Sequence, residues 1–131
     1  MAITALAGPL SNFILAFLSS FLYVAMCLPV YRYAWATTEP YLILCYIVEA
    51  LIYINLGLGV FNLIPIPPLD GSKILYSFLP NRIIFRIIPY EKYIQFVLII
   101  LLYLGFLSRP MGIAVNWISD LFLTLAKGVI L

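Results

Sequence analysis

The chain has 131 residues, of which 66% are hydrophobic and 9% are charged, and its mean hydropathy is +1.16. These values exclude an ordinary soluble domain and indicate an integral membrane protein in a lipid bilayer. The net charge of +2 is spread thinly, so nothing in the composition predicts nucleic-acid binding.

The first half of the chain predicts two membrane-spanning helices. Gly8-Pro9 sets the start of the first helix, because proline suits the first helical position, and uncharged residues continue to Pro29. The first span covers about 10–29, and its residues 10–28 alone are roughly 28 Å long as a helix, enough to cross the hydrocarbon core. A signal peptide is the alternative, but no Lys or Arg precedes the apolar run. After a polar break at 30–40, the second span covers about 41–61.

Polar side chains are few within these spans. Glu49 is a candidate functional group by its position in the second span, although we favour a packing role for it. Asn55 and Asn62 are two helical turns apart and share a face if the helix extends that far. Cys27 and Cys45 lie in apolar runs, which is typical of small buried hydrophobic residues rather than of a disulfide or a metal pair.

The most distinctive stretch is the predicted loop at 62–71. Its three prolines remove backbone N–H donors and disfavour helix in the residues before them. Irregular backbone at membrane depth is tolerated where it is buried in protein or lines a wet cavity, so the stretch predicts a site. Taken alone, Asp70-Gly71 is also a common turn, and Asp70 could cap the next helix. The stretch reads Asn62-Leu-Ile-Pro65-Ile-Pro67-Pro68-Leu-Asp70-Gly71.

The second half predicts a short helix over 71–79, a polar linker over 80–92 and a third apolar helix over about 90–107. The segment 111–131 carries a polar row at steps of three and four residues, which is typical of an amphipathic helix on a bundle or at the interface. The fold class is therefore an all-α membrane protein with one membrane domain over 1–131. Its elements are three long apolar helices, the proline-rich membrane-embedded loop, the short helix and the C-terminal amphipathic helix.

The 62–71 stretch resembles the second signature of the site-2 protease family, which are intramembrane zinc metalloproteases of the M50 type. Gly8, Pro9 and Asn12 resemble the opening of a membrane helix in that family, and the order of elements matches over roughly 5–107. The resemblance implies that Asp70 is a zinc ligand and that Gly71 and the Gly-Pro opening are structural, and we expect a structural role for Asn55 as well. The substrate is then an unwound transmembrane segment, which we expect the stretch 63–68, with Pro65 and Pro67, to hold by strand addition. Asn62 is a candidate hydrogen-bond partner for the substrate or the oxyanion.

The family's His-Glu-x-x-His helix has no counterpart, because the sequence contains no histidine. We expect the two histidine ligands to come from a missing N-terminal part or from a separate chain. The chain alone is then predicted to be inactive and to form the C-terminal part of a metalloendopeptidase. A catalytically inactive membrane scaffold is one alternative. A small transporter subunit is another, supported by Glu49 and Asn55 within a span.

Four basic residues between the second and third apolar segments predict the topology. The positive-inside rule places the 73–92 linker in the cytoplasm and the 30–40 loop outside. We expect a multi-pass protein of a prokaryotic cell membrane. The four residues are Lys73, Arg82, Arg86 and Lys92.

Cysteine labelling tests this topology in a background without Cys27 and Cys45. We expect an impermeant thiol reagent added outside to label Thr37→Cys, and to label Ser77→Cys or Asn81→Cys only after the membrane is opened. Labelling of the linker variants in sealed cells would contradict the predicted orientation.

Overall fold

The computed structural model describes residues 2–30 and 33–130, which form helices joined by short connections and contain no strand. The all-α fold class is confirmed. In chain order the elements are α1 (Ala2–Val30), the 3₁₀ turn η1 (Ala34–Thr37), α2 (Glu39–Leu63), α3 (Asp70–Tyr76), α4 (Asn81–Ile87), the 3₁₀ turn η2 (Ile88–Tyr90), α5 (Glu91–Tyr103) and α6 (Ser108–Ile130).

Three of the described helices, α1, α2 and α6, are long and apolar enough to cross a membrane. The third long helix is not the one that the sequence suggested, since α5 is shorter than the predicted 90–107. Gly105, at φ +75°, ends the helix in the left-handed conformation, and Phe106 N–H bonds back to the Leu101 carbonyl at 3.1 Å. The predicted amphipathic segment at 111–131 instead begins three residues earlier and forms α6.

The start of α1 also differs from the prediction. Pro9 lies inside the helix, which already begins at Ala2, because residues 2–7 include three alanines and a leucine that favour helix. A proline at this position cannot donate a hydrogen bond to the Ala5 carbonyl. Its ring is fully buried, so the packing of Pro9 against its neighbours offsets part of that loss.

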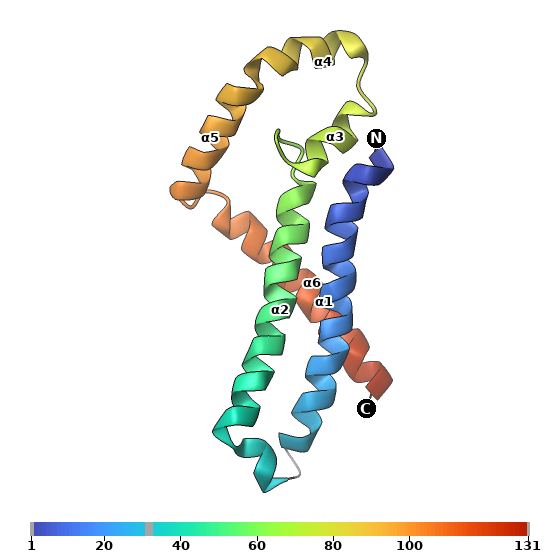
Figure 1. Cartoon of the computed structure of the whole chain (residues 1–131), viewed down its shortest axis with the longest axis vertical. Helices are drawn as coiled ribbons and strands as arrows, with labels where there is room; N and C mark the ends of the chain where they lie inside the picture. The colour runs from blue at the N-terminus through green and yellow to red at the C-terminus, as the bar shows by residue number, and fades with distance from the viewer. Residues whose placement is uncertain (1, 31–32, 131) are drawn as a thin grey trace.

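The core lies where α6 crosses the pair formed by α1 and α2 (Figure 1). The two helices run side by side in opposite directions, and Ala16, Ile52 and Leu56 are fully buried along their contact, which we call the α1–α2 seam. Four α6 side chains cover this group, namely Val115, Ile118, Phe122 and Leu123. Phe122 also meets the Phe17 ring edge-on, with centroids 5.2 Å apart.

Small residues allow the three helices to approach one another closely. Ser20 on α1 and Ser119 and Ala126 on α6 are buried, and Gly59 on α2 contacts the Phe13 ring. Membrane helices pack through such residues because lipid provides little hydrophobic drive for helix association. The long helices therefore form one tightly packed unit.

The chain between α3 and α6 leaves this unit as an arm of α4, η2 and α5 (Figure 1). The predicted 80–92 linker is helical over most of its length, because isoleucines recur among its charges at positions that suit a helix. Leu98 is the buried residue of α5. The arm begins beside the N-terminal end of α1, where the candidate site also lies.

The buried Ser119 hydroxyl has no hydrogen-bond partner in the described part of the chain, whereas the buried Ser20 hydroxyl donates to the Ala16 carbonyl at 2.8 Å. An unpaired buried hydroxyl lowers stability by about 1 kcal/mol or more, so Ser119→Ala should raise the free energy of unfolding by about that amount. The matched variant Ser20→Ala removes a satisfied hydroxyl and should not raise it. Unfolding of both variants in detergent measures the difference, and equal effects would contradict the assignment.

Candidate functional site

The proline loop is shorter than predicted and covers residues 64–69. Asn62 belongs to the last turn of α2, and Asp70 is the first residue of α3. The helix continues to Leu63 because Ile64, which precedes Pro65, is the first residue forced out of helical geometry, at φ −60° and ψ 126°. The short helix is correspondingly 70–76 rather than 71–79.

The backbone N–H groups of the loop are already hydrogen-bonded to nearby carbonyls of the same chain segment. Prolines 65, 67 and 68 have none, and the other N–H groups of residues 64–69 bond within the turn: Ile64 to the Phe61 carbonyl at 3.1 Å, Ile66 to Ile64 at 2.8 Å and Leu69 to Ile66 at 2.9 Å. The peptide bond between Pro67 and Pro68 is cis. An extended substrate could therefore donate hydrogen bonds to the loop carbonyls but would find no free N–H there, so a full two-way strand ladder does not fit this conformation.

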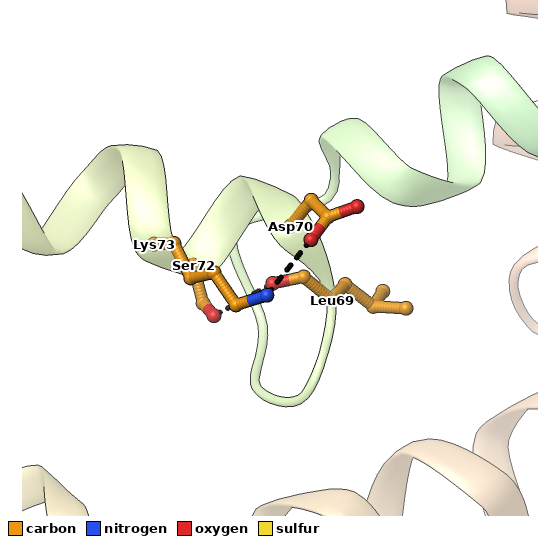
Figure 2. Close-up of polar contacts among 4 residues, drawn as sticks. All are labelled: Leu69, Asp70, Ser72 and Lys73. Carbon is orange, nitrogen blue, oxygen red and sulfur yellow. Dashed lines mark hydrogen bonds and ion pairs between the residues drawn. The ribbon is translucent and has the colours of Figure 1, made fainter. Parts of the chain in front are cut away.

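Gly71 allows α3 to return directly against the end of α2. A Cβ atom at this position would collide with the backbone carbonyls of Leu63 and Ile64. Ser72 strengthens the same corner, because its hydroxyl donates to the Leu69 carbonyl at 2.7 Å (Figure 2). Its backbone N–H donates to the same carbonyl at 3.1 Å. Any larger residue at position 71 must push α3 away from α2.

Asp70 does not cap α3. The N-cap residue is Leu69, which makes no side-chain cap bond, so the turn-and-cap explanation of Asp70 does not describe this structure. The carboxylate instead lies between two helices: Asp70 Oδ1 is 3.0 Å from Lys73 Nζ (Figure 2). Asp70 Oδ2 is 3.1 Å from the position that a Cβ would take at Gly8 on α1. The Gly8-Pro9 stretch and the proline loop, both singled out in the sequence, thus meet at this carboxylate.

The ion pair with Lys73 leaves the Asp70 carboxylate available to bind another cation. The Lys73 side chain is 60% exposed and the Asp70 side chain 31% exposed, and pairs this accessible to solvent contribute little to stability. Asp70 also occupies the first turn of α3, where the helix dipole favours a negative charge. Asp70 can accordingly exchange Lys73 for another cation at small cost.

Asp70 and Lys73 line an open cavity of about 830 Å³. Thr4 and Ala5 of α1 form one wall, and residues of α3 and α4 such as Tyr76 and Ile84 form the others. The volume is in the range of small-molecule and peptide sites. The carboxylate therefore faces a space that can receive a ligand or further protein side chains.

Tyr76 connects this cavity to the arm. Its hydroxyl donates to Glu91 Oε1 at 3.3 Å, across the start of α5. Burial and the neighbouring Glu91 carboxylate both raise the pKa of the Tyr76 hydroxyl above its usual value near 10. Tyr76 is thus neutral at physiological pH and acts as a hydrogen-bond donor at the edge of the cavity.

The remaining predicted residues are distributed more widely. Asn12 lies one turn beyond Gly8 on α1 and is half-buried. Asn55 donates to the Leu51 carbonyl of its own helix at 2.8 Å, and α2 does extend far enough for Asn55 and Asn62 to share a face. In the loop, Pro65 is exposed and Pro67 is buried.

Sequence reasoning assigns only Asp70 of the cavity residues to a site and misses the others, Lys73, Thr4 and Tyr76 among them. Lys73 enters it only as a charge that indicates the topology. A helical spacing could have found two of them, since Asp70, Lys73 and Tyr76 follow one another at steps of three on a short helix. Thr4 had no such signal, because its place depends on how α1 packs against α3.

The described residues do not by themselves form a metal site. No group of three or more His, Cys, Asp or Glu side chains within residues 2–30 and 33–130 is arranged to hold a metal ion. Catalytic zinc takes three protein ligands, and Asp70 is one candidate that opens onto a cavity.

Comparison with known proteins shows the family to which the chain belongs. The family model for peptidase family M50 matches residues 33–107, more than half of the chain, including the proline loop and Asp70. The chain therefore belongs to peptidase family M50, the site-2 protease family, for which zinc is the expected cofactor.

A Bacillus subtilis (strain 168) protein with the name "Putative zinc metalloprotease YwhC" is 33% identical to the chain over 116 residues. The match covers 88% of this chain and 49% of that protein, so the chain spans about half the length of the curated relative. No solved structure gives a significant match.

The close approach of the backbone to Gly71 predicts that adding a single methyl group there lowers the stability of the protein. Gly71→Ala should lower the stability of the folded protein by about 1–3 kcal/mol, the usual cost of overpacking, because the new Cβ meets backbone that cannot move aside easily. Gly57→Ala is the matched control: a Cβ there meets nothing within 4 Å, and alanine favours helix. Thermal unfolding in detergent compares the two, and equal midpoints would show that the corner is not tightly packed.

Proposed function

We propose that this chain forms part of an intramembrane zinc metalloprotease, which hydrolyses peptide bonds in transmembrane segments of other membrane proteins. In this proposal Asp70 contributes one zinc ligand, and the loop at 64–69 together with Asn62 holds the substrate. The supporting observation is the placement of Asp70: its carboxylate caps no helix, makes only a weak ion pair, and faces a cavity next to α1.

The two histidine ligands are proposed to come from a His-Glu-x-x-His helix outside this chain, in a longer protein or a partner. The cavity of about 830 Å³ beside Asp70 is the space into which that helix would bring them. Bound zinc would supply a water molecule whose pKa is lowered toward neutrality. The described residues then have two tasks, to present the Asp70 carboxylate and to exclude other conformations of α3.

The loop carbonyls are the proposed contacts for an unwound substrate. Because the N–H donors of the loop are already used, the substrate backbone would donate to the loop and not accept from it. Asn62 is half-buried at the end of α2, and its side-chain amide can supply a donor that the loop lacks. An unwound segment is needed because a helix keeps its own carbonyls bonded.

The test compares Asp70→Asn with Lys73→Gln in a protein that contains this chain and the family's His-Glu-x-x-His helix. Asp70→Asn keeps the shape of the side chain but replaces the carboxylate by a poorer ligand, so we expect weakened zinc binding and at least about a 100-fold loss of cleavage. Lys73→Gln removes the same ion pair and leaves the carboxylate, so zinc content and cleavage should be retained.

Equal behaviour of the two variants would contradict the proposal, because it would reduce Asp70 to a partner of Lys73. Full zinc content without cleavage in the unaltered protein would favour an inactive scaffold instead. Asn62→Ala provides a further comparison: cleavage should fall while zinc is retained. Zinc is measured by metal analysis at matched stability in detergent.

A further inference from the structure

A second, smaller cavity lies at the other end of the α1–α2 seam, away from Asp70. It has a volume of about 150 Å³ and is lined by both cysteines of the protein, Cys27 from α1 and Cys45 from α2, together with Tyr23 and Glu49. Both cysteines are free thiols, Cys45 buried and Cys27 half-buried. The sequence alone treated them as unrelated hydrophobic residues, whereas the fold places them in one cavity.

The register of the two helices places Cys27 and Cys45 at the same level of the α1–α2 seam. Phe13 packs on Gly59, and Ala16 on α1 lies in one cluster with Leu56 and Ile52 on α2. Each step of three or four residues forward along α1 thus matches the same step backward along α2, as expected for antiparallel helices in contact. Continuing these steps along α1 pairs Tyr23 with Glu49, and then Cys27 with Cys45, and all four of these residues are among those that line the cavity.

An independent contact fixes this end of the seam. The Tyr41 hydroxyl donates to the Met26 carbonyl at 2.7 Å, which ties the residue before Cys27 to the helical turn before Cys45. The two cysteines are therefore held opposite each other by backbone-anchored packing. Their meeting does not depend on the flexibility of an exposed loop.

We propose that Cys27 and Cys45 are a redox-active pair that forms a reversible disulfide across the α1–α2 seam. The oxidant is a small-molecule disulfide. One cysteine thiolate attacks it to give a mixed disulfide and one small thiol. The second cysteine then displaces the second small thiol and closes the Cys27–Cys45 bond. The two cysteines lose two electrons and two protons in all, and the oxidant is reduced to two thiols.

A metal ion is a poorer occupant for this cavity. Thiolate sites for zinc use three or four protein ligands, and no group of three or more His, Cys, Asp or Glu side chains in the described ranges is arranged for one. A disulfide needs only the two sulfur atoms, and both cysteines line the cavity. The predicted topology places this end near the outer side of the membrane, where disulfides persist.

The Cys27–Cys45 disulfide would link α1 to α2 covalently, and the candidate site lies at the other end of these two helices. The disulfide would hold α1 and α2 in the register that brings Gly8 to Asp70 at the opposite end of the seam. It would also restrict the unfolded chain, which stabilises the folded form. This inference stands apart from the proposed protease function, because it uses none of the residues assigned to zinc or substrate.

The test treats the purified full chain in detergent with dithiodipyridine, which is small, apolar and releases a coloured thiol. We expect two thiols released per chain and a monomeric product that carries no pyridylthio adduct. Its mass should be lower by two hydrogen atoms, and a chymotryptic digest should contain the Cys27 and Cys45 peptides joined. The midpoint of thermal unfolding should rise by about 5 °C or more on oxidation and return on reduction.

The matched control moves one thiol around the helix. In Cys45→Ala with Leu44→Cys the second thiol lies at a position where leucine is 52% exposed, so the same reagent should leave two pyridylthio adducts and no internal bond. Cys45→Ser should show no rise in the unfolding midpoint. Two adducts on the native chain, a disulfide-linked dimer as its product, or equal internal bonding in the shifted variant would each overturn the proposal.

Discussion

The return of the chain at residues 64–69 is the constraint on which the candidate site depends. Pro65 forces Ile64 out of helical geometry and so ends α2 at Leu63. Gly71 then lets α3 begin in direct contact with the backbone that has just ended α2. With both ends of the turn held so closely, Asp70 has one place to lie, against α1 at Gly8. Two stretches about sixty residues apart in the sequence thereby form one corner.

The ion pair at this corner is weak enough for Asp70 to exchange Lys73 for another cation. A carboxylate in an apolar chain needs a partner, and Lys73 provides one from the next turn of the same short helix, at 3.0 Å. Because both groups reach the cavity and remain accessible to solvent, their attraction is screened and weak. The family assignment makes zinc the expected cofactor of the protein.

The long helices connect the two ends of the molecule. Small buried residues along the α1–α2 seam, together with the crossing of α6, hold α1 and α2 in one register. That register sets the contact of Gly8 with Asp70 at one end and the facing of Cys27 and Cys45 at the other. By contrast, the arm of α4, η2 and α5 buries little, and Tyr76 links it to α3 through Glu91. The packed seam and the lightly packed arm thus meet at the cavity beside Asp70.

The sequence by itself determined the features that depend on neighbouring residues. Apolar runs of sufficient length define α1 and α2, and the prolines define the break after α2, because span length and proline geometry are local properties. Local rules failed where packing supplies the larger free energy. Pro9 is accommodated within α1, α6 is the third long helix in place of the segment at 90–107, and Asp70 contacts α1 without capping α3. The contact of Asp70 with α1 and the placement of Cys27 and Cys45 in one cavity were decided only by the tertiary structure, because contacts between distant residues depend on the register of whole helices and no local pattern encodes that register.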